Sequence, residues 1–189
     1  MNNKLTYICC ILLAFILVGC AQPPVAEMDK AREAVFKAEN DPYAVQYANT
    51  ALARARESLR KMQDEADSKR YDAAKTHALD AISAAEKAIA DGRAGAQRAG
   101  GQADALITTL RAEIDETSRN VNGARYSNLA LDYTALDKAI ADAHTTTDQA
   151  EVDQAAGRFD QAQDRARVVR SDLAEINQKV ANAVIKRKK

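Results

Sequence analysis

The sequence lacks tryptophan, and its three prolines stand at positions 23, 24 and 42, so no residue after Pro42 is a strong helix breaker. Aromatic residues make up 5% of the 189 residues and glycine occurs seven times, whereas alanine occurs 40 times. This composition argues against a sheet-based enzyme and favours long helices. An excess of either charge is also missing, because 27 basic residues balance 27 acidic ones. We therefore expect no nucleic-acid partner, which would require a basic face.

Cysteine is absent after residue 20, since the three cysteines are Cys9, Cys10 and Cys20. Lys4 precedes an apolar run at residues 8–18, which is shorter than the roughly 20 residues that a membrane-spanning helix needs. A basic residue followed by a short apolar run is typical of a cleaved leader. Because the three cysteines all lie in or at the end of this leader, the chain after it keeps at most one cysteine, and we expect no disulfide within it.

The leader ends in Leu17-Val18-Gly19-Cys20, which resembles the lipobox of bacterial lipoproteins. The resemblance implies that a signal peptidase recognises Leu17, Val18 and Gly19, and that Cys20 then carries lipid and anchors the chain to a membrane. Residues 1–19 are then the signal peptide, and residues 20–25 are the lipidated cysteine and its tether. The absence of Asp directly after Cys20 implies an outer-membrane location facing the periplasm. The alternative is an ordinary secretory leader with a chance cysteine.

The rest of the chain predicts an all-α fold, an elongated antiparallel helical bundle. Asp41 and Pro42 predict a helix start, whereas Asn122-Gly123 predict a helix end. The glycines between 92 and 101 keep the helical phase, so we expect one continuous helix of about 50 residues, with a break at Gly100-Gly101 as the alternative. The expected helices span residues 26–39, 42–68, 71–121, 127–156 and 159–185.

A pentapeptide repeat indicates a duplication. Arg70-Tyr71-Asp72-Ala73-Ala74 returns as Arg158-Phe159-Asp160-Gln161-Ala162, 88 positions later, and the flanking alanine stripes follow the same offset. The pattern predicts two tandem three-helix units that share one long central helix. We place the first unit at residues 26–99, the second at 100–185 and a basic tail at 186–189.

Three stretches of the first unit carry a family resemblance: residues 24–31 (PVAEMDKA), 38–44 (AENDPYA) and 69–75 (KRYDAAK). Together they resemble the small envelope lipoproteins grouped as domain of unknown function 4398, over about residues 24–95. The resemblance implies a lipid-anchored helical domain that faces the periplasm. It implies no activity, so no catalytic residue is transferred from it.

The polar residues give little sign of catalysis. His77 and His144 are not at matched repeat positions, and acidic residues alternate with basic ones at helical spacing, as in Glu57 with Lys61. Such spacing is typical of surface ion pairs. We therefore expect no catalytic residue, no metal site and no cofactor.

The concentrated charge lies at the C-terminus, in Lys186, Arg187, Lys188 and Lys189. These residues suit a helix end, contact with an anionic lipid surface or wall polymer, or covalent wall linkage through Lys189. The expected function is that of a non-enzymatic, lipid-anchored spacer or adaptor for other envelope proteins in the periplasm. Two alternatives are a carrier with a small ligand or peptide in a seam between the helical units, and a peptidoglycan-associated lipoprotein that uses the basic C-terminus.

Overall fold

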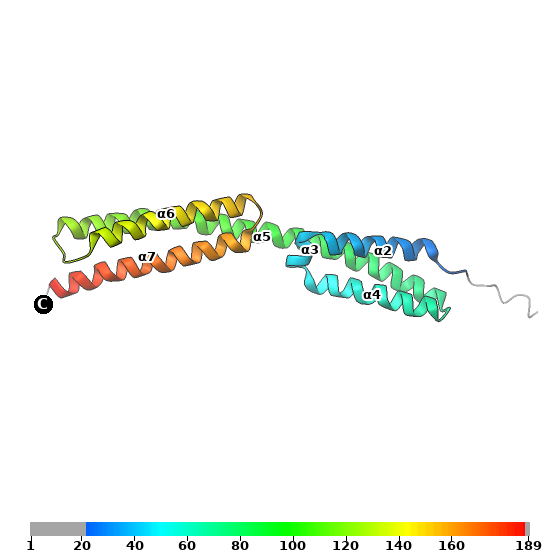
Figure 1. Ribbon diagram of the computed structural model, residues 1–189. Helices are drawn as coiled ribbons and strands as arrows, with labels where there is room; N and C mark the ends of the chain where they lie inside the picture. The colour runs from blue at the N-terminus through cyan, green and yellow to red at the C-terminus, as the bar shows by residue number, and fades with distance from the viewer. Residues whose placement is uncertain (1–21, 188–189) are drawn as a thin grey trace, which may run out of the picture. The chain divides into compact units, whose positions relative to one another are not determined.

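The computed structural model describes residues 22–187, and within them every regular element is a helix, as the sequence predicted. Contacts divide the chain into two units, with the division inside the longest helix: unit 1 ends at Gly92, and unit 2 begins at Arg93. The helices are α2 (Val25–Asn40), α3 (Pro42–Tyr47), α4 (Asn49–Asp67), α5 (Tyr71–Tyr126), α6 (Tyr133–Ala155) and α7 (Phe159–Arg187) (Figure 1).

The central helix α5 is continuous over 56 residues and passes through Gly100-Gly101 without a break, which confirms the longer of the two helix predictions. Two of its glycines allow a close neighbour. A Cβ atom on Gly92 would lie 2.5 Å from the backbone nitrogen of Ala44, and one on Gly100 would lie 3.1 Å from the ring of Phe159. Glycine lowers helix propensity, but at these two positions the absence of a side chain is what allows the neighbouring segment to pack closely.

Unit 1 packs α2, α3 and α4 against the first part of α5 (Figure 1). Alanine fills much of this core, and the side chains that close the gaps are Val35, Leu52 and Met62, each at most 2% exposed. Small side chains allow helix axes to come close, because the distance between packed helices depends on the residues at the contact. The buried alanines of α5 in this core are Ala78, Ala81, Ala84, Ala85 and Ala88.

The helix predicted over residues 42–68 is wrong in one respect, because it is broken at Ala48. The start is as predicted: the Oδ1 atom of Asp41 accepts hydrogen bonds from the backbone nitrogens of Tyr43 (3.0 Å) and Ala44 (2.8 Å). At Ala48 the backbone leaves helical geometry (φ −130°, ψ 35°), so α4 starts anew at Asn49. After this break, Leu52 of α4 faces the core of unit 1 and is 1% exposed.

The hairpins α4–α5 and α6–α7 have the same turn, offset by the 88 positions of the sequence repeat. Lys69 donates its backbone N–H to Ala66 (2.9 Å) as Gly157 does to Gln154 (2.9 Å), and Arg70 donates to Glu65 as Arg158 does to Asp153. The residues at the centre of the turns, Lys69 (φ 60°) and Gly157 (φ 75°), both adopt the left-handed conformation. The shared backbone geometry supports the duplication inferred from sequence.

Unit 2 packs the second part of α5 with α6 and α7 around larger side chains (Figure 1). The predicted helix end at Asn122-Gly123 is wrong, because α5 continues to Tyr126 and the left-handed residue is Asn128. The next helix was expected at 127 but begins at Tyr133, capped by Asp132, whose side chain accepts from the backbone nitrogen of Ala135 at 3.0 Å. The intervening loop is held by Leu129, which is 6% exposed.

Candidate functional site

The residues that the sequence analysis assigned to lipid attachment lie outside the described part of the chain. This holds for Leu17, Val18, Gly19 and Cys20, and so their roles stay predictions. The described chain enters its first helix at Val25, close behind this segment. Among residues 22–187, no helix is both long enough and apolar enough to cross a membrane.

The basic C-terminus falls partly within the described chain. Lys186 and Arg187 form the last turn of α7, whereas Lys188 and Lys189 lie outside the described residues. The guanidinium of Arg187 donates from Nη1 to the backbone oxygen of Ser127. This bond ties the end of α7 to the turn after α5, so Arg187 lies against the body of unit 2.

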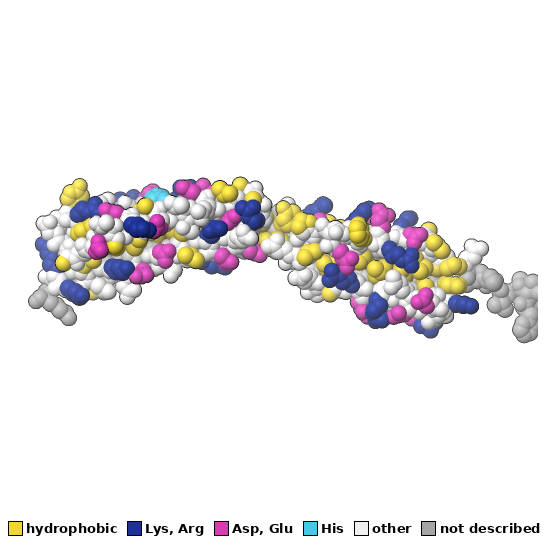
Figure 2. Space-filling view, in the orientation of Figure 1, with side chains coloured by type: hydrophobic (Ala, Val, Ile, Leu, Met, Phe, Trp, Pro, Cys, Tyr) yellow, Lys and Arg dark blue, Asp and Glu magenta, His cyan; other side chains and the backbone are white. Residues whose placement is uncertain are grey.

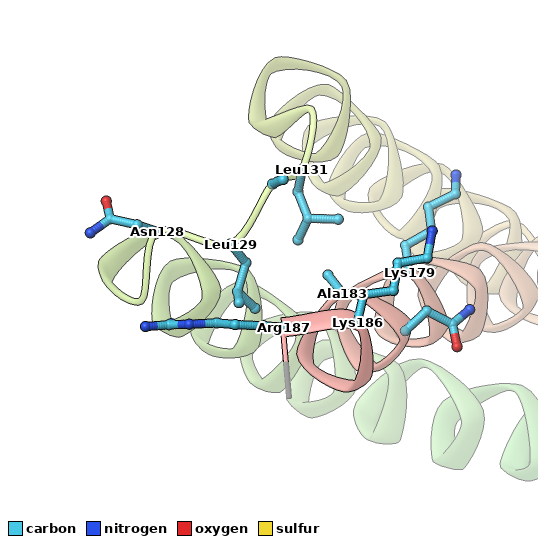
Figure 3. Close-up of a pocket in the computed structure, with 9 residues that line it drawn as sticks. Asn128, Leu129, Leu131, Lys179, Ala183, Lys186 and Arg187 are labelled. Carbon is cyan, nitrogen blue, oxygen red and sulfur yellow. The ribbon is translucent and has the colours of Figure 1, made fainter. Parts of the chain in front are cut away.

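Two open grooves flank Arg187 at this end of unit 2. The first, of about 570 Å³, lies between the α5–α6 loop and α7, and Leu129 and Leu131 point into it (Figure 3). Its other lining includes Lys179 and Lys186 of α7 and the amides of Asn128 and Asn182. The groove thus has apolar side chains from the α5–α6 loop and basic side chains from α7.

The second groove, of about 620 Å³, lies between α5 and α7 and shares Leu129 and Arg187 with the first. It adds Arg119 of α5 and the apolar side chains Val180 and Val184. We call the lining residues of these two grooves the basic end: they include four cations, Arg119, Lys179, Lys186 and Arg187, and no carboxylate. In Figure 2, several Lys and Arg side chains lie over the end of unit 2 where α7 finishes.

Three other surface grooves differ from the basic end in the charge of their lining. Glu113 and Glu116 accompany Arg170 in one groove of unit 2, and the two grooves of unit 1 likewise mix basic and acidic residues. The basic end therefore carries an excess of positive charge that these three grooves lack, in a chain whose net charge is zero.

Two of the four cations of the basic end have a polar partner within the protein, and two have none among the described residues. Lys179 pairs with Glu175, Nζ to Oε1 at 2.7 Å, and Arg187 is bound to Ser127. Among the interactions of the described residues, Arg119 and Lys186 have no hydrogen bond or ion pair. These two side chains are consequently available to an anionic partner.

A polar contact between α5 and α7 borders the basic end. Asn177 donates from Nδ2 to the hydroxyl of Thr117 at 2.8 Å and accepts from Nδ2 of Asn120 at 3.0 Å. Thr117 is 1% exposed, so the bond satisfies a buried hydroxyl. This contact fixes the register of the two helices that carry the cations.

A second charged cluster lies at the α6–α7 turn. Asp153 is 5% exposed, and its carboxylate accepts from Arg158 and Arg165, each at 2.6 Å. The hydrogen bonds from Arg165 and then Arg158 hold the pKa of Asp153 below its usual value. Because each carboxylate oxygen of Asp153 accepts from an arginine of the same hairpin, the cluster stabilises the α6–α7 turn.

The histidines are not brought together with catalytic partners. Nδ1 of His77 lies 3.8 Å from Asp80, one helical turn away, and His144 is exposed on α6. The predicted surface pairing of Glu57 with Lys61 is present at 3.6 Å. In residues 22–187 no three His, Cys, Asp or Glu side chains cluster as metal ligands do.

The sequence analysis identified Lys186 and Arg187 of the basic end but not Arg119 and Lys179. Arg119 lies 67 positions before Lys186 in the chain, and only the packing of α5 against α7 places both at the same end. One signal was present: from residue 177 to the C-terminus the chain has five basic residues and no acidic one. That stretch extends the basic run of residues 186–189 back to Lys179.

The comparisons identify a family for the first part of the chain. Residues 26–103 match the model described as Domain of unknown function (DUF4398), which covers the helices of unit 1 and the start of unit 2. No curated protein and no solved structure matches the chain. This match over residues 26–103 confirms the family resemblance that the sequence predicted over about residues 24–95.

Proposed function

We propose that this protein is a non-enzymatic, lipid-anchored helical protein of a bacterial envelope that acts as a spacer or adaptor for other envelope proteins. The anchor is lipid on Cys20, after cleavage behind Leu17-Val18-Gly19. The outer membrane, with the helices facing the periplasm, is the proposed location.

The packing of unit 1 is the observation that carries this proposal. The α5 alanines in its core, Ala78, Ala81, Ala85 and Ala88, have no exposed surface, and Gly92 brings α5 against the backbone of α3. Close-packed helices with little internal space suit a rigid part better than a ligand carrier. A spacer or adaptor needs that rigidity.

The surface of unit 1 offers a place for a protein partner. Phe36 on α2 is 65% exposed and Leu79 on α5 is 52% exposed, in a surface otherwise rich in ion pairs. Exposed aromatic and aliphatic side chains of this kind are frequent anchors of protein interfaces. They support the adaptor role over that of a spacer without partners.

The anchor is tested with the full chain expressed in a bacterial envelope. Cys20→Ser should leave residues 1–19 attached and abolish labelling by fatty acid, whereas the unchanged chain should begin at a lipid-bearing Cys20 in mass spectrometry. An unmodified thiol at Cys20 in the native product would overturn the anchor.

The adaptor role is tested with a photo-crosslinking amino acid in place of Phe36. The matched control places it at Lys30, which is exposed on the same helix. We expect one defined envelope protein to be captured from position 36 and not from position 30. Equal capture at both positions, or none at either, would argue against a partner at this face.

A further inference from the structure

We propose that the basic end of unit 2 binds the surface of a bilayer that contains anionic phospholipid. This contact is separate from any lipid on Cys20, and it goes beyond the spacer or adaptor function.

The charge of the lining carries the first step. Two neighbouring grooves present Arg119, Lys179, Lys186 and Arg187 without a carboxylate, whereas the other three grooves combine both signs. The dipole of α7 explains basic residues in its last turn, since cations are favourable at a helix C-terminus. It does not explain Arg119, which lies seven residues before the end of α5, outside the last turn. An anionic partner would account both for the basic residues in the last turn of α7 and for Arg119 on α5.

The spread of the cations carries the second step. Arg119 and Lys186 line different grooves, with Arg187 between them and tied to Ser127. Side chains so arranged do not converge on one anion, as the ligands of a single phosphate or carboxylate would. They suit a surface on which negative groups are spaced apart, as phospholipid head groups are.

Apolar groups beside the cations carry the third step. Leu131 and Val184 line the grooves and keep part of their surface exposed, and Tyr126, the last residue of α5, is 89% exposed. Cations next to exposed aromatic and aliphatic side chains are typical of surfaces that lie in the head-group region of a membrane.

The test uses the chain from residue 20 onward with Cys20→Ser, which contains every described residue and can carry no thioether lipid. It is sedimented with vesicles of phosphatidylcholine alone and with added phosphatidylglycerol, at low and at high salt. We expect binding only to the vesicles with phosphatidylglycerol and a marked loss at high salt, since exposed charges are screened.

The decisive variant is Arg119→Gln combined with Lys186→Gln. Neither side chain makes a polar contact among the described residues, so circular dichroism should be unchanged. Each cation near an anionic surface changes partitioning about fivefold, so the pair should weaken binding roughly 25-fold. The matched control is Arg93→Gln with Arg98→Gln, two exposed arginines of the same unit that do not line the grooves. It removes the same charge and should change binding less than threefold.

Three outcomes would overturn the proposal. The first is the absence of binding to phosphatidylglycerol vesicles at low salt, and the second is an equal loss in both double variants. The third is binding to purified peptidoglycan with none to the vesicles, which would assign the basic end to a wall polymer. Because the tested chain lacks the lipid, these results are independent of the experiment on Cys20.

Discussion

Unit 1 presents Ala81, Ala85 and Ala88 on the inner face of α5, whereas the repeat-equivalent positions on α7 of unit 2 are Val169, Leu173 and Ile176. All six side chains are at most 3% exposed. The same hairpin turn therefore supports two kinds of core, one of small side chains and one of branched ones. The comparison indicates that the turn determines the connection between the two helices of each hairpin, whereas the core side chains determine how closely those helices pack.

The far ends of the two units differ more than their hairpins. In unit 1, Asp41 and Pro42 lead directly into α3, and α3 lies against Gly92. In unit 2, the equivalent of Gly92 is Val180, and a longer loop containing Leu129 and Leu131 separates α5 from α6. This end of unit 1 is thus closed by α3, whereas the corresponding end of unit 2 has the grooves that the cations line.

The largest expected effect on stability comes from exchanging the residue types at one pair of equivalent core positions, Ala85 and Leu173. Leu173→Ala should lower the free energy of unfolding by about 3 kcal/mol, because a buried leucine leaves a cavity. The reciprocal Ala85→Leu should also destabilise, by about 2 kcal/mol, because close-packed alanine leaves no room for the added atoms. Urea unfolding followed by circular dichroism measures both. Tolerance of Leu at position 85 would show that unit 1 is packed more loosely than its buried alanines indicate.

A smaller effect is expected from exchanging the residues at the centre of the hairpin turns. Lys69 (φ 60°) holds a conformation that favours glycine, so Lys69→Gly should stabilise unit 1 by roughly 0.5–1 kcal/mol. Gly157→Lys should destabilise unit 2 by about 1 kcal/mol for the same reason. Thermal unfolding of the two single variants measures the shifts. Shifts of the same sign would contradict the equivalence of the turns.

The two turns also show what sequence could and could not predict. Gly157 is a recognisable turn signal, but Lys69 is not, and only the repeat places a turn there. The helix end at Asn122-Gly123 failed because a glycine inside a helix costs about 1 kcal/mol, which packing of the helix against its neighbours outweighs. The sequence placed the start of the next helix at residue 127, whereas Asp132 caps it, and both Ser and Asp are common helix caps.

The candidate site was predictable only where its residues are contiguous. Lys186 and Arg187 stood out as a basic run, and the family resemblance over unit 1 is confirmed by the match to residues 26–103. Arg119 and Leu129 carry no local signal, because their place in the basic end depends on tertiary packing. Periodicity predicts which face of a helix is buried, but it does not predict which ends of two helices meet.

The smallest effect concerns the carboxylates of the two turns and appears as a pH dependence. Arg165 and Arg158 lower the pKa of Asp153, and Arg70 lowers the pKa of Glu65. A carboxylate whose pKa is lowered by folding stabilises the fold above its unfolded pKa, about 3.9 for Asp, and loses that contribution as pH falls through the folded pKa.

Stability measured from neutral pH down through that range should therefore decline less steeply in Asp153→Asn than in the unchanged chain. Glu65→Gln is the matched variant and should flatten the profile less, because Glu65 has one arginine partner and Asp153 has two. Both effects are small because the arginines are more than 40% exposed and solvent screens their charge. A pH profile of Asp153→Asn parallel to that of the unchanged chain would mean that neither arginine stabilises the fold through the carboxylate of Asp153.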